Sequence, residues 1–241
     1  DKLLGAGVYL DYVNNDARLV IENIKEADEL GGLMASHVKV VGVLHDDNGR
    51  INGVKAKDLL TDEEFEIRAK MVINTTGPWV TKTLGLDDKN GEGEVIRPTK
   101  GVHLVVDSSR LRVPQPTYFD SGIGDGRMIF VVPRENKTYF GTTDTDYTGD
   151  YKHPRVEQAD VDYLLKAINN RYPEAEITIN DIEASWAGLR PLLSGNGSSD
   201  YNGGGSNTGK VSDESFENLI KTAVAYSKDE ASRGEVEKSI S

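Results

Sequence analysis

The sequence predicts a mixed α/β fold, α+β in part, with two portions. The first is part of a doubly wound domain with a β-meander, and the second is an antiparallel sheet domain with helices. Apolar residues recur at helical spacing over 17–27, and three short β-rich segments with tight turns follow them. Two further β-rich segments over 128–142 are separated by only a few polar residues, which is typical of a hairpin.

For the N-terminal part, the sequence predicts one helix, a meander and a buried strand. Asn14-Asn15-Asp16 supplies N-cap chemistry for the helix, and Gly31-Gly32 ends it. Asn48-Gly49 favours a tight turn between the first two strands. The meander strands are predicted at 37–44, 50–59 and 65–68. The apolar run at 71–74 is predicted as a fourth strand, covered on both faces, that ends in Thr-Thr-Gly-Pro-Trp.

The middle of the chain predicts a second sheet with one helix. A strand over 101–107 carries His103, and the hairpin strands are predicted at 128–133 and 138–142. Val161, Leu164, Leu165 and Ile168 mark a helix that ends near Tyr172-Pro173. An extended segment over 177–186 leads into Gly188-Leu189-Arg190-Pro191, which is predicted as a partly buried apolar turn.

The composition changes after Leu193. Residues 194–209 are mostly Ser, Gly and Asn, which is typical of a flexible linker. Apolar residues at helical spacing then predict an amphipathic helix over 213–227, with acidic residues in its first turn. We therefore expect a linker and a surface helix at this end of the sequence.

Charge and composition exclude several classes of function. The formal net charge of −12 gives an acidic surface, which repels nucleic-acid backbones and anionic lipid. No apolar run approaches the roughly 20 residues that span a bilayer. The absence of cysteine excludes disulfides and thiolate chemistry and fits a cytoplasmic protein. No spacing of His, Asp and Glu indicates a metal site, and the glycine clusters at 5–7 and 122–126 lack the following helix that a phosphate cradle needs.

The order of the elements is that of the second half of a flavin-binding doubly wound domain, in which ligands bind beyond the carboxyl ends of the strands. Five stretches, in the same order, then resemble the flavin-dependent glycerol-3-phosphate dehydrogenases and, more closely, the bacterial α-glycerophosphate oxidases. They are Tyr9–Leu19, Ile73–Trp79, Arg97–His103, Gly141–Asp144 and Gly188–Leu192. The segment 194–241 looks like the insert that distinguishes the oxidases.

The resemblance implies an FAD-dependent oxidoreductase of glycerol metabolism. It would oxidise glycerol 3-phosphate to dihydroxyacetone phosphate, with oxygen as acceptor and hydrogen peroxide as product. The family's Gly-rich FAD motif would precede Asp1, and its C-terminal part would follow Ser241. We therefore expect a fragment that binds FAD poorly and is inactive by itself. The implied domains are a partial FAD-binding domain at 1–95, a substrate-binding domain at 96–185, a return to the FAD domain at 186–193 and the insert at 194–241.

The resemblance also implies roles for single residues. Arg190 would bind the substrate phosphate, since a guanidinium offers two parallel charge-assisted bonds. His103 would be catalytic, because an imidazole with an ordinary pKa near 6.5 suits proton transfer. A plain core histidine remains the alternative for His103. The residues expected to bind FAD are Val38, Thr75, Thr76, Gly77, Trp79 and Gly188.

Other functions stay open at this stage. A quinone-linked dehydrogenase with peripheral membrane contact would share the same motifs, but the acidic chain and the insert favour the oxidase. A flavin-dependent amine or amino-acid oxidase would share the meander, although Gly141–Asp144 and Gly188–Leu192 weigh against it. A non-enzymatic alternative is a binding module whose helix at 213–227 recruits a partner. The sequence leaves the oligomeric state open.

Overall fold

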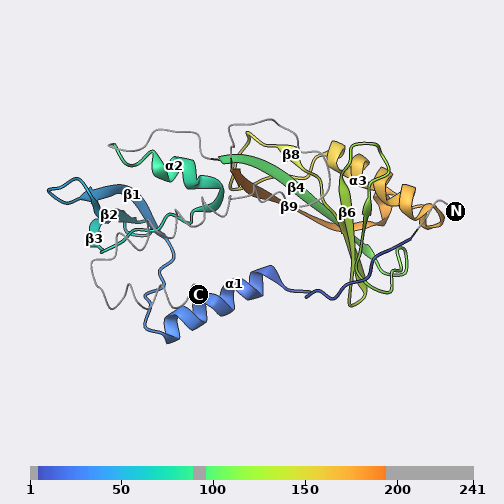
Figure 1. Ribbon diagram of the computed structural model, residues 1–241, viewed down its shortest axis with the longest axis horizontal. Helices are drawn as coiled ribbons and strands as arrows, with labels where there is room; N and C mark the ends of the chain where they lie inside the picture. Colours follow the sequence, from blue (N-terminus) through green and yellow to red (C-terminus); the bar gives the residue numbers. More distant parts are fainter. Residues whose placement is uncertain (1–4, 89–95, 194–241) are drawn as a thin grey trace.

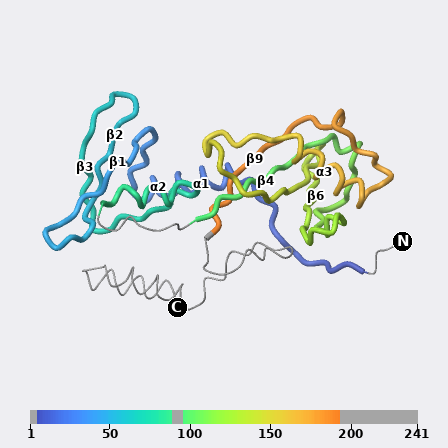
Figure 2. Tube along the Cα trace, turned by 90° about the horizontal axis from the view of Figure 1, so that it is seen from above, coloured from blue at the N-terminus to red at the C-terminus, as the bar shows by residue number. Residues whose placement is uncertain are grey.

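The computed structural model describes residues 5–88 and 96–193. They form two antiparallel sheets, which lie at opposite ends of the view in Figure 1 and again in the perpendicular view of Figure 2. A three-stranded sheet comes first in the sequence, and a larger six-stranded sheet follows. The predicted fold class, α/β with a meander and an antiparallel sheet domain, is confirmed for this part of the chain.

The N-terminal helix begins where the cap residues predict. Helix α1 spans Asp16–Glu29, and the side chain of Asn15 accepts a hydrogen bond of 3.1 Å from the backbone N–H of Arg18. None of its residues is buried. The meander follows as β1 (Val38–His45), β2 (Ile51–Asp58) and β3 (Glu64–Arg68), paired in that order.

The predicted strand at 71–74 is wrong. A strand needs a partner for its backbone groups, and within the described residues none pairs with this segment. The side chains of Met71, Val72 and Ile73 are 40%, 38% and 73% exposed, so they are not covered on both faces. The following turn is real: a 3-10 helix, η1 (Gly77–Trp79), leads into the short helix α2 (Val80–Leu84).

The six-stranded sheet is built around one long central strand. This is β4 (Ile96–Asp107); β9 (Ile182–Leu193) pairs along one edge of it, and β7 (Lys137–Gly141) and β8 (Thr145–Asp146) share the other. Strands β6 (Met128–Arg134) and β5 (Thr117–Asp120) continue the sheet beyond β7. Helix α3 (Gln158–Arg171) and the 3-10 turns η2 (Pro173–Ala175) and η3 (Ile179–Asp181) connect β8 to β9.

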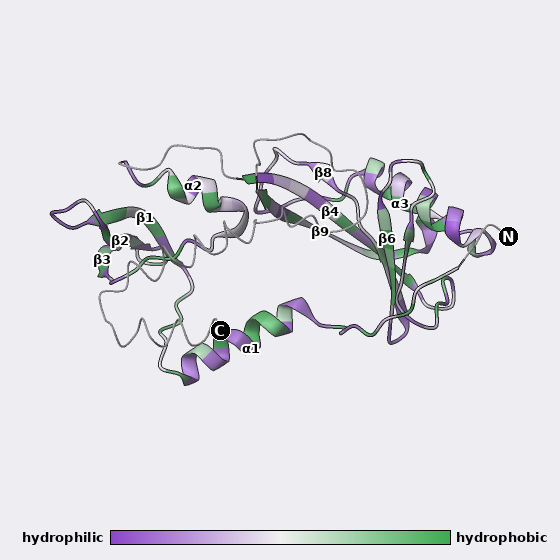
Figure 3. Ribbon diagram, in the orientation of Figure 1, coloured by the Kyte–Doolittle hydropathy of each residue, from purple (hydrophilic) through white to green (hydrophobic). Residues whose placement is uncertain are grey.

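The core lies between one face of this sheet and α3. Because side chains alternate along a strand, Val102, Leu104 and Val106 of β4 point to the same face. They pack with residues of β6 and β7 and with the apolar side of α3, and the buried cluster includes Ile129, Val131, Phe140, Leu164, Ala167 and Ile168. Figure 3 shows hydrophobic residues along β6 and the parts of β4 and β9 near it. The opposite face of the sheet does not take part in this core.

A buried ion pair fastens α3 to the core face of β4. The ammonium of Lys100 lies 2.7 Å from Asp160 and 3.2 Å from Glu157, and the Lys100 and Asp160 side chains are 3% and 5% exposed. Burial works to lower the pKa of Lys100, but the bonds to these two carboxylates outweigh it and raise the pKa above 10.5. The Asp160 carboxylate also accepts from the backbone N–H of Glu157, so one side chain both caps the helix and joins it to the sheet.

The linker predicted at 194–209 and the helix predicted at 213–227 lie outside the described residues.

Candidate functional site

Strand register brings the candidate residues onto one face of the six-stranded sheet. In the pairing of β4 with β9, Gly101 lies opposite Gly188 and His103 lies opposite Trp186. Arg190 occupies the next same-face position along β9. Directly paired residues point to the same side of a sheet, so these five residues share a surface. We call it the site face; it is the face turned away from α3 and the core.

Arg190 lies flat against the backbone of Gly101. A Cβ added at Gly101 would lie 2.7 Å from Nη2 and 2.8 Å from Nη1 of the guanidinium, so the guanidinium occupies the space that a side chain at this position would fill. Nη2 donates to Oγ1 of Thr142 (3.0 Å), and Nη1 donates to the carbonyl of Thr143 and the carboxylate of Asp144 (both 3.3 Å). The predicted turn around Arg190 is wrong: β9 runs straight through it, because every residue from 187 to 193 has a partner on β4.

His103 is held between an aromatic ring and bare backbone. Trp186 stacks on the imidazole with ring centroids 4.8 Å apart and planes 13° from parallel, and Tyr139 meets it edge-on at 6.0 Å. On β7, a Cβ added at Gly141 would lie 2.6 Å from Cδ2 of the ring, so glycine again makes room. Burial, and then the positive charge of Arg190, lower the pKa of His103 to about 4. The imidazole is therefore neutral at physiological pH.

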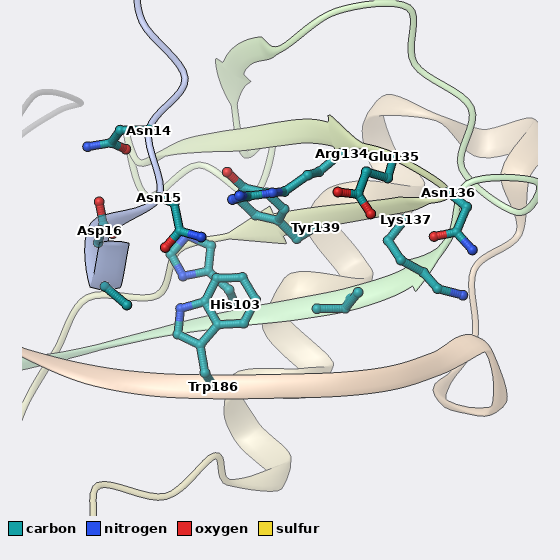
Figure 4. A pocket seen from close by; sticks show the side chains of 12 residues that line it. Asn14, Asn15, Asp16, His103, Arg134, Glu135, Asn136, Lys137, Tyr139 and Trp186 are labelled. Carbon is teal, nitrogen blue, oxygen red and sulfur yellow. The ribbon is translucent and has the colours of Figure 1, made fainter. Parts of the chain in front are cut away.

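The aromatic residues form the floor of a pocket of about 530 Å³. His103, Tyr139 and Trp186 lie on strands, while Asn15 and its neighbours at the N-terminus of α1 form the opposite wall (Figure 4). The β6–β7 hairpin, residues 134–137, closes one end. Within the described residues neither ring nitrogen of His103 is hydrogen-bonded, so both are available to a bound molecule.

The Gly77 turn lies against the strand that carries Arg190. η1 packs on β9, so two segments more than 100 residues apart in the sequence meet. Gly77 has a φ of +54°, which favours glycine, and an added Cβ would meet nothing within 4 Å in the described chain. Gly188 is equally open. Trp79 is 37% exposed and lies 6.4 Å, ring centre to ring centre, from Tyr151.

The structure thus gathers most, but not all, of the predicted residues. Arg190, Gly188 and His103 share the site face, and η1, which contains Gly77 and Trp79, contacts β9. Thr75 and Thr76 are exposed, and the Thr76 hydroxyl donates to Oδ1 of Asn74 at 2.7 Å. Val38 begins β1 in the other sheet and is not part of the site face.

Sequence reasoning missed several residues of the site. Tyr139 and Trp186 were not singled out, although each is directly across a strand pair from β4. Asp144, the last residue of the stretch Gly141–Asp144, was not predicted as a site residue either, and it pairs with Arg190. Gly101 and Gly141 are the signal that could have found them, since a glycine inside a strand marks a close approach by another group.

The described residues contain neither a candidate metal cluster nor a candidate membrane-spanning helix. Over 5–88 and 96–193, no three His, Asp or Glu side chains come close enough together to hold a metal ion. In the same ranges no helix has both the length and the apolar character needed to cross a bilayer.

Comparison with known proteins identifies relatives of the whole chain. It is 64% identical over 239 residues to the alpha-glycerophosphate oxidase of Streptococcus pneumoniae and 63% identical over 240 residues to that of Enterococcus casseliflavus. These matches cover 99% and 100% of this chain, but the chain spans only 39% of the length of either relative.

A solved structure agrees with these relatives. The glycerol-3-phosphate dehydrogenase from Bacillus halodurans, complexed with FAD, superposes with a TM-score of 0.68 at 48% identity. The match covers 74% of this chain and 36% of that protein. The family model for FAD dependent oxidoreductases matches residues 1–226, which is most of the sequence. The chain therefore belongs to the FAD dependent oxidoreductase family.

Proposed function

We propose that the full-length protein uses FAD to oxidise glycerol 3-phosphate to dihydroxyacetone phosphate, with oxygen as acceptor and hydrogen peroxide as product. The observation that carries this proposal is the site face, where Arg190 lies beside a neutral His103 and the open backbone of Gly188. The names of the two relatives and of the superposed dehydrogenase support the same substrate. Since the chain spans 39% of those relatives, the activity is assigned to the whole protein.

The residues present fit a flavin ring. Gly77 and Gly188 expose backbone with no neighbour within 4 Å of an added Cβ in the described chain, which lets a flat ring approach closely. Trp186, two residues before Gly188 on the same face of β9, is 45% exposed and offers an aromatic surface. We assign cofactor contacts to Gly77, Trp79 and Gly188, and to Thr75 and Thr76 beside them. Val38 is proposed to contact the adenine end through its backbone. When bound, FAD supplies the acceptor for a hydride.

Arg190 would bind the substrate phosphate, and His103 would accept a proton from the substrate. The guanidinium of Arg190 stays charged at any physiological pH and can bind two phosphate oxygens side by side. The unprotonated nitrogen of His103 can accept the proton of the substrate hydroxyl as the carbon–hydrogen bond breaks, and its pKa of about 4 makes it a weaker base than the ordinary value near 6.5 implies. With the phosphate held by Arg190, the hydroxyl-bearing carbon is confined near the imidazole, and this positioning lowers the barrier.

Oxygen is preferred over a quinone as acceptor, because the relatives at 63% and 64% identity are named oxidases whereas the dehydrogenase is 48% identical. We assign residues 1–95 to the FAD-binding part, 96–185 to a substrate domain, 186–193 to a return to the FAD part and 194–241 to an insert. We place the protein in the cytoplasm because of its acidic surface and its lack of cysteine.

The test is an assay of the purified full-length protein with defined substrates. We expect oxygen uptake and stoichiometric peroxide release with glycerol 3-phosphate and none with glycine. Turnover only with a quinone under anaerobic conditions would replace the oxidase by the dehydrogenase, and turnover with glycine would replace both. Arg190→Ala should raise KM for glycerol 3-phosphate by about tenfold or more, since a charged hydrogen bond contributes about 1.5–3 kcal/mol. The matched control is Arg97→Ala, which removes a more exposed arginine from the same sheet.

A further inference from the structure

We propose that Asp144, together with Thr142, is a positioning residue that orients Arg190 toward a phosphorylated substrate. The inference rests on the proposed function of Arg190 and deepens it. Residues Thr142, Thr143 and Asp144, which we call the Arg190 bracket, connect β7 to β8 on the far edge of β4 from β9. The guanidinium of Arg190 reaches across the backbone of Gly101 and donates hydrogen bonds to all three residues. The acceptors are the Thr142 hydroxyl, the Thr143 carbonyl and the Asp144 carboxylate.

The Arg190 bracket is itself fixed to β4. The Thr143 side chain is buried, with 2% exposed, and its hydroxyl accepts from the backbone N–H of Val102 (3.1 Å) and donates to the carbonyl of Lys100 (3.5 Å). The Thr142 hydroxyl donates its proton to the carbonyl of Thr143 at 3.0 Å, so its lone pairs are left to accept from Arg190. The bracket is therefore a set of acceptors with a fixed direction, not a mobile loop end.

The bonds to the bracket leave one edge of the guanidinium unused. Arginine has five N–H donors: two on each Nη atom and one on Nε. The bracket takes two from Nη1 and one from Nη2. Within the described residues, Nε and the remaining donor of Nη2 have no partner. Nε and one donor of Nη2 can together bind two phosphate oxygens, so the bracket leaves Arg190 with donors for a phosphate.

Asp144 supplies the charged part of this arrangement. Its side chain is 15% exposed, against 36% for Arg190, so the carboxylate is the more buried member of the pair. Asp144 bonds Nη1 and therefore holds the arginine through an atom other than Nε and the remaining Nη2 donor. Without Asp144, the long Arg190 side chain would sample other rotamers in the free protein. Ordering it on binding would then cost conformational entropy and weaken the affinity for the phosphate.

The experiment compares Asp144→Ala and Asp144→Asn in the full-length protein loaded with FAD. The readouts are KM and kcat for glycerol 3-phosphate, the competitive inhibition constant of inorganic phosphate, and kcat/KM for unphosphorylated glycerol. For Asp144→Ala we expect KM and the phosphate inhibition constant to rise about tenfold, with kcat within about threefold and the rate on glycerol unchanged. Asp144→Asn keeps an acceptor oxygen, so both constants should stay within about threefold of wild type.

Asp146→Ala is the matched control, because Asp146 forms an exposed pair with Arg97 only two residues farther along the chain. It should leave both constants within about twofold of wild type, as exposed ion pairs contribute little. If Asp144→Ala does not fold, Thr142→Val replaces it and should raise both constants while Thr142→Ser restores them. Equal constants for Asp144→Ala, Asp146→Ala and wild type would overturn the inference.

The outcomes separate this inference from the proposed function. A wild-type protein that does not oxidise glycerol 3-phosphate removes the proposed function, and the inference with it. A wild-type protein that does, with Arg190→Ala weakened but Asp144→Ala and Thr142→Val unaffected, removes only the inference. A loss of kcat/KM on glycerol equal to that on glycerol 3-phosphate would also overturn it, since that result indicates general damage to the site.

Discussion

Gly101→Ala is expected to displace the guanidinium of Arg190 while leaving the sheet folded. A Cβ at this position would lie 2.7 Å from Nη2 of Arg190, 2.8 Å from Nη1 and 2.7 Å from Oγ1 of Thr142. Unstrained contacts between a carbon and a nitrogen atom lie at about 3.5 Å, so the guanidinium of Arg190 must move away from the new Cβ by roughly 0.7 Å. The nearest atoms belong to side chains, and Arg190 is a flexible one that can move.

The retreat translates into a loss of affinity. The bonds from Arg190 to the Arg190 bracket are already 3.0 to 3.3 Å long, so a shift of this size breaks at least one. A hydrogen bond with a charged partner contributes about 1.5–3 kcal/mol, and the 36% exposure of Arg190 points to the lower end. Since about 1.4 kcal/mol corresponds to a factor of ten, KM for glycerol 3-phosphate should rise about tenfold with a smaller change in kcat.

The assay is peroxide release at varied glycerol 3-phosphate, with thermal unfolding as the check on stability. Gly42→Ala is the control, because a Cβ there would meet Lys55 at an ordinary 3.4 Å. Both variants should unfold within about 4 °C of wild type, the shift that corresponds to ~1 kcal/mol in a domain of this size. An unchanged KM in Gly101→Ala would refute the position of the guanidinium over β4.

Three further predictions concern His103 and the buried ion pair. Trp186→Ala should expose the imidazole and raise the pKa of His103 from about 4 toward 6.5 in an NMR titration, whereas Trp186→Phe should keep the pKa low. The same His103 pKa in Trp186→Ala and in wild type would contradict a role of the stacked Trp186 ring in burying the imidazole. Lys100→Met leaves Asp160 buried without its ammonium and should cost about 3–5 kcal/mol in urea unfolding at pH 7, where an unchanged midpoint would contradict the pair. Because the pKa of Lys100 is raised in the folded state, its contribution is complete below pH 10.5 and is lost as the pH rises through the folded value. Unfolding of wild type at pH 8 and at pH 11 to 12 should show that loss, and Lys100→Met should not.

Local signals in the sequence were sufficient for most elements. The cap at Asn15, the Asn48-Gly49 turn and the alternating strands around it act between near neighbours, and α1, β1 and β2 begin and end within a residue or two of prediction. The strand predicted at 71–74 failed because an apolar run specifies burial but not its partner. Strand β5 was missed entirely, since four residues carry too little pattern.

The site depended on contacts that are distant in sequence. Arg190 and His103 were predicted as site residues through motif resemblance, but their surroundings come from the register of β9 on β4, which neither segment reveals alone. The same register explains why Gly188-Leu189-Arg190-Pro191 is a strand: Pro191 lacks an N–H, but Arg190 before it and Leu192 after it are both paired with β4. Asp144 could be identified as a partner of Arg190 only after β7, β8 and β9 had been placed around β4.

The alternation of charge and glycine along β4 has a consequence for how the chain finds its pairing during folding. Lys100 and Gly101 are adjacent and point to opposite sides, one toward the Asp160 carboxylate and the other beneath a guanidinium. Sliding β4 by a single position would send the lysine toward Arg190 and leave Asp160 facing bare backbone. Two cations would then repel one another while an acid stood isolated in an apolar interior, so misaligned sheets are selected against by electrostatics as well as by packing.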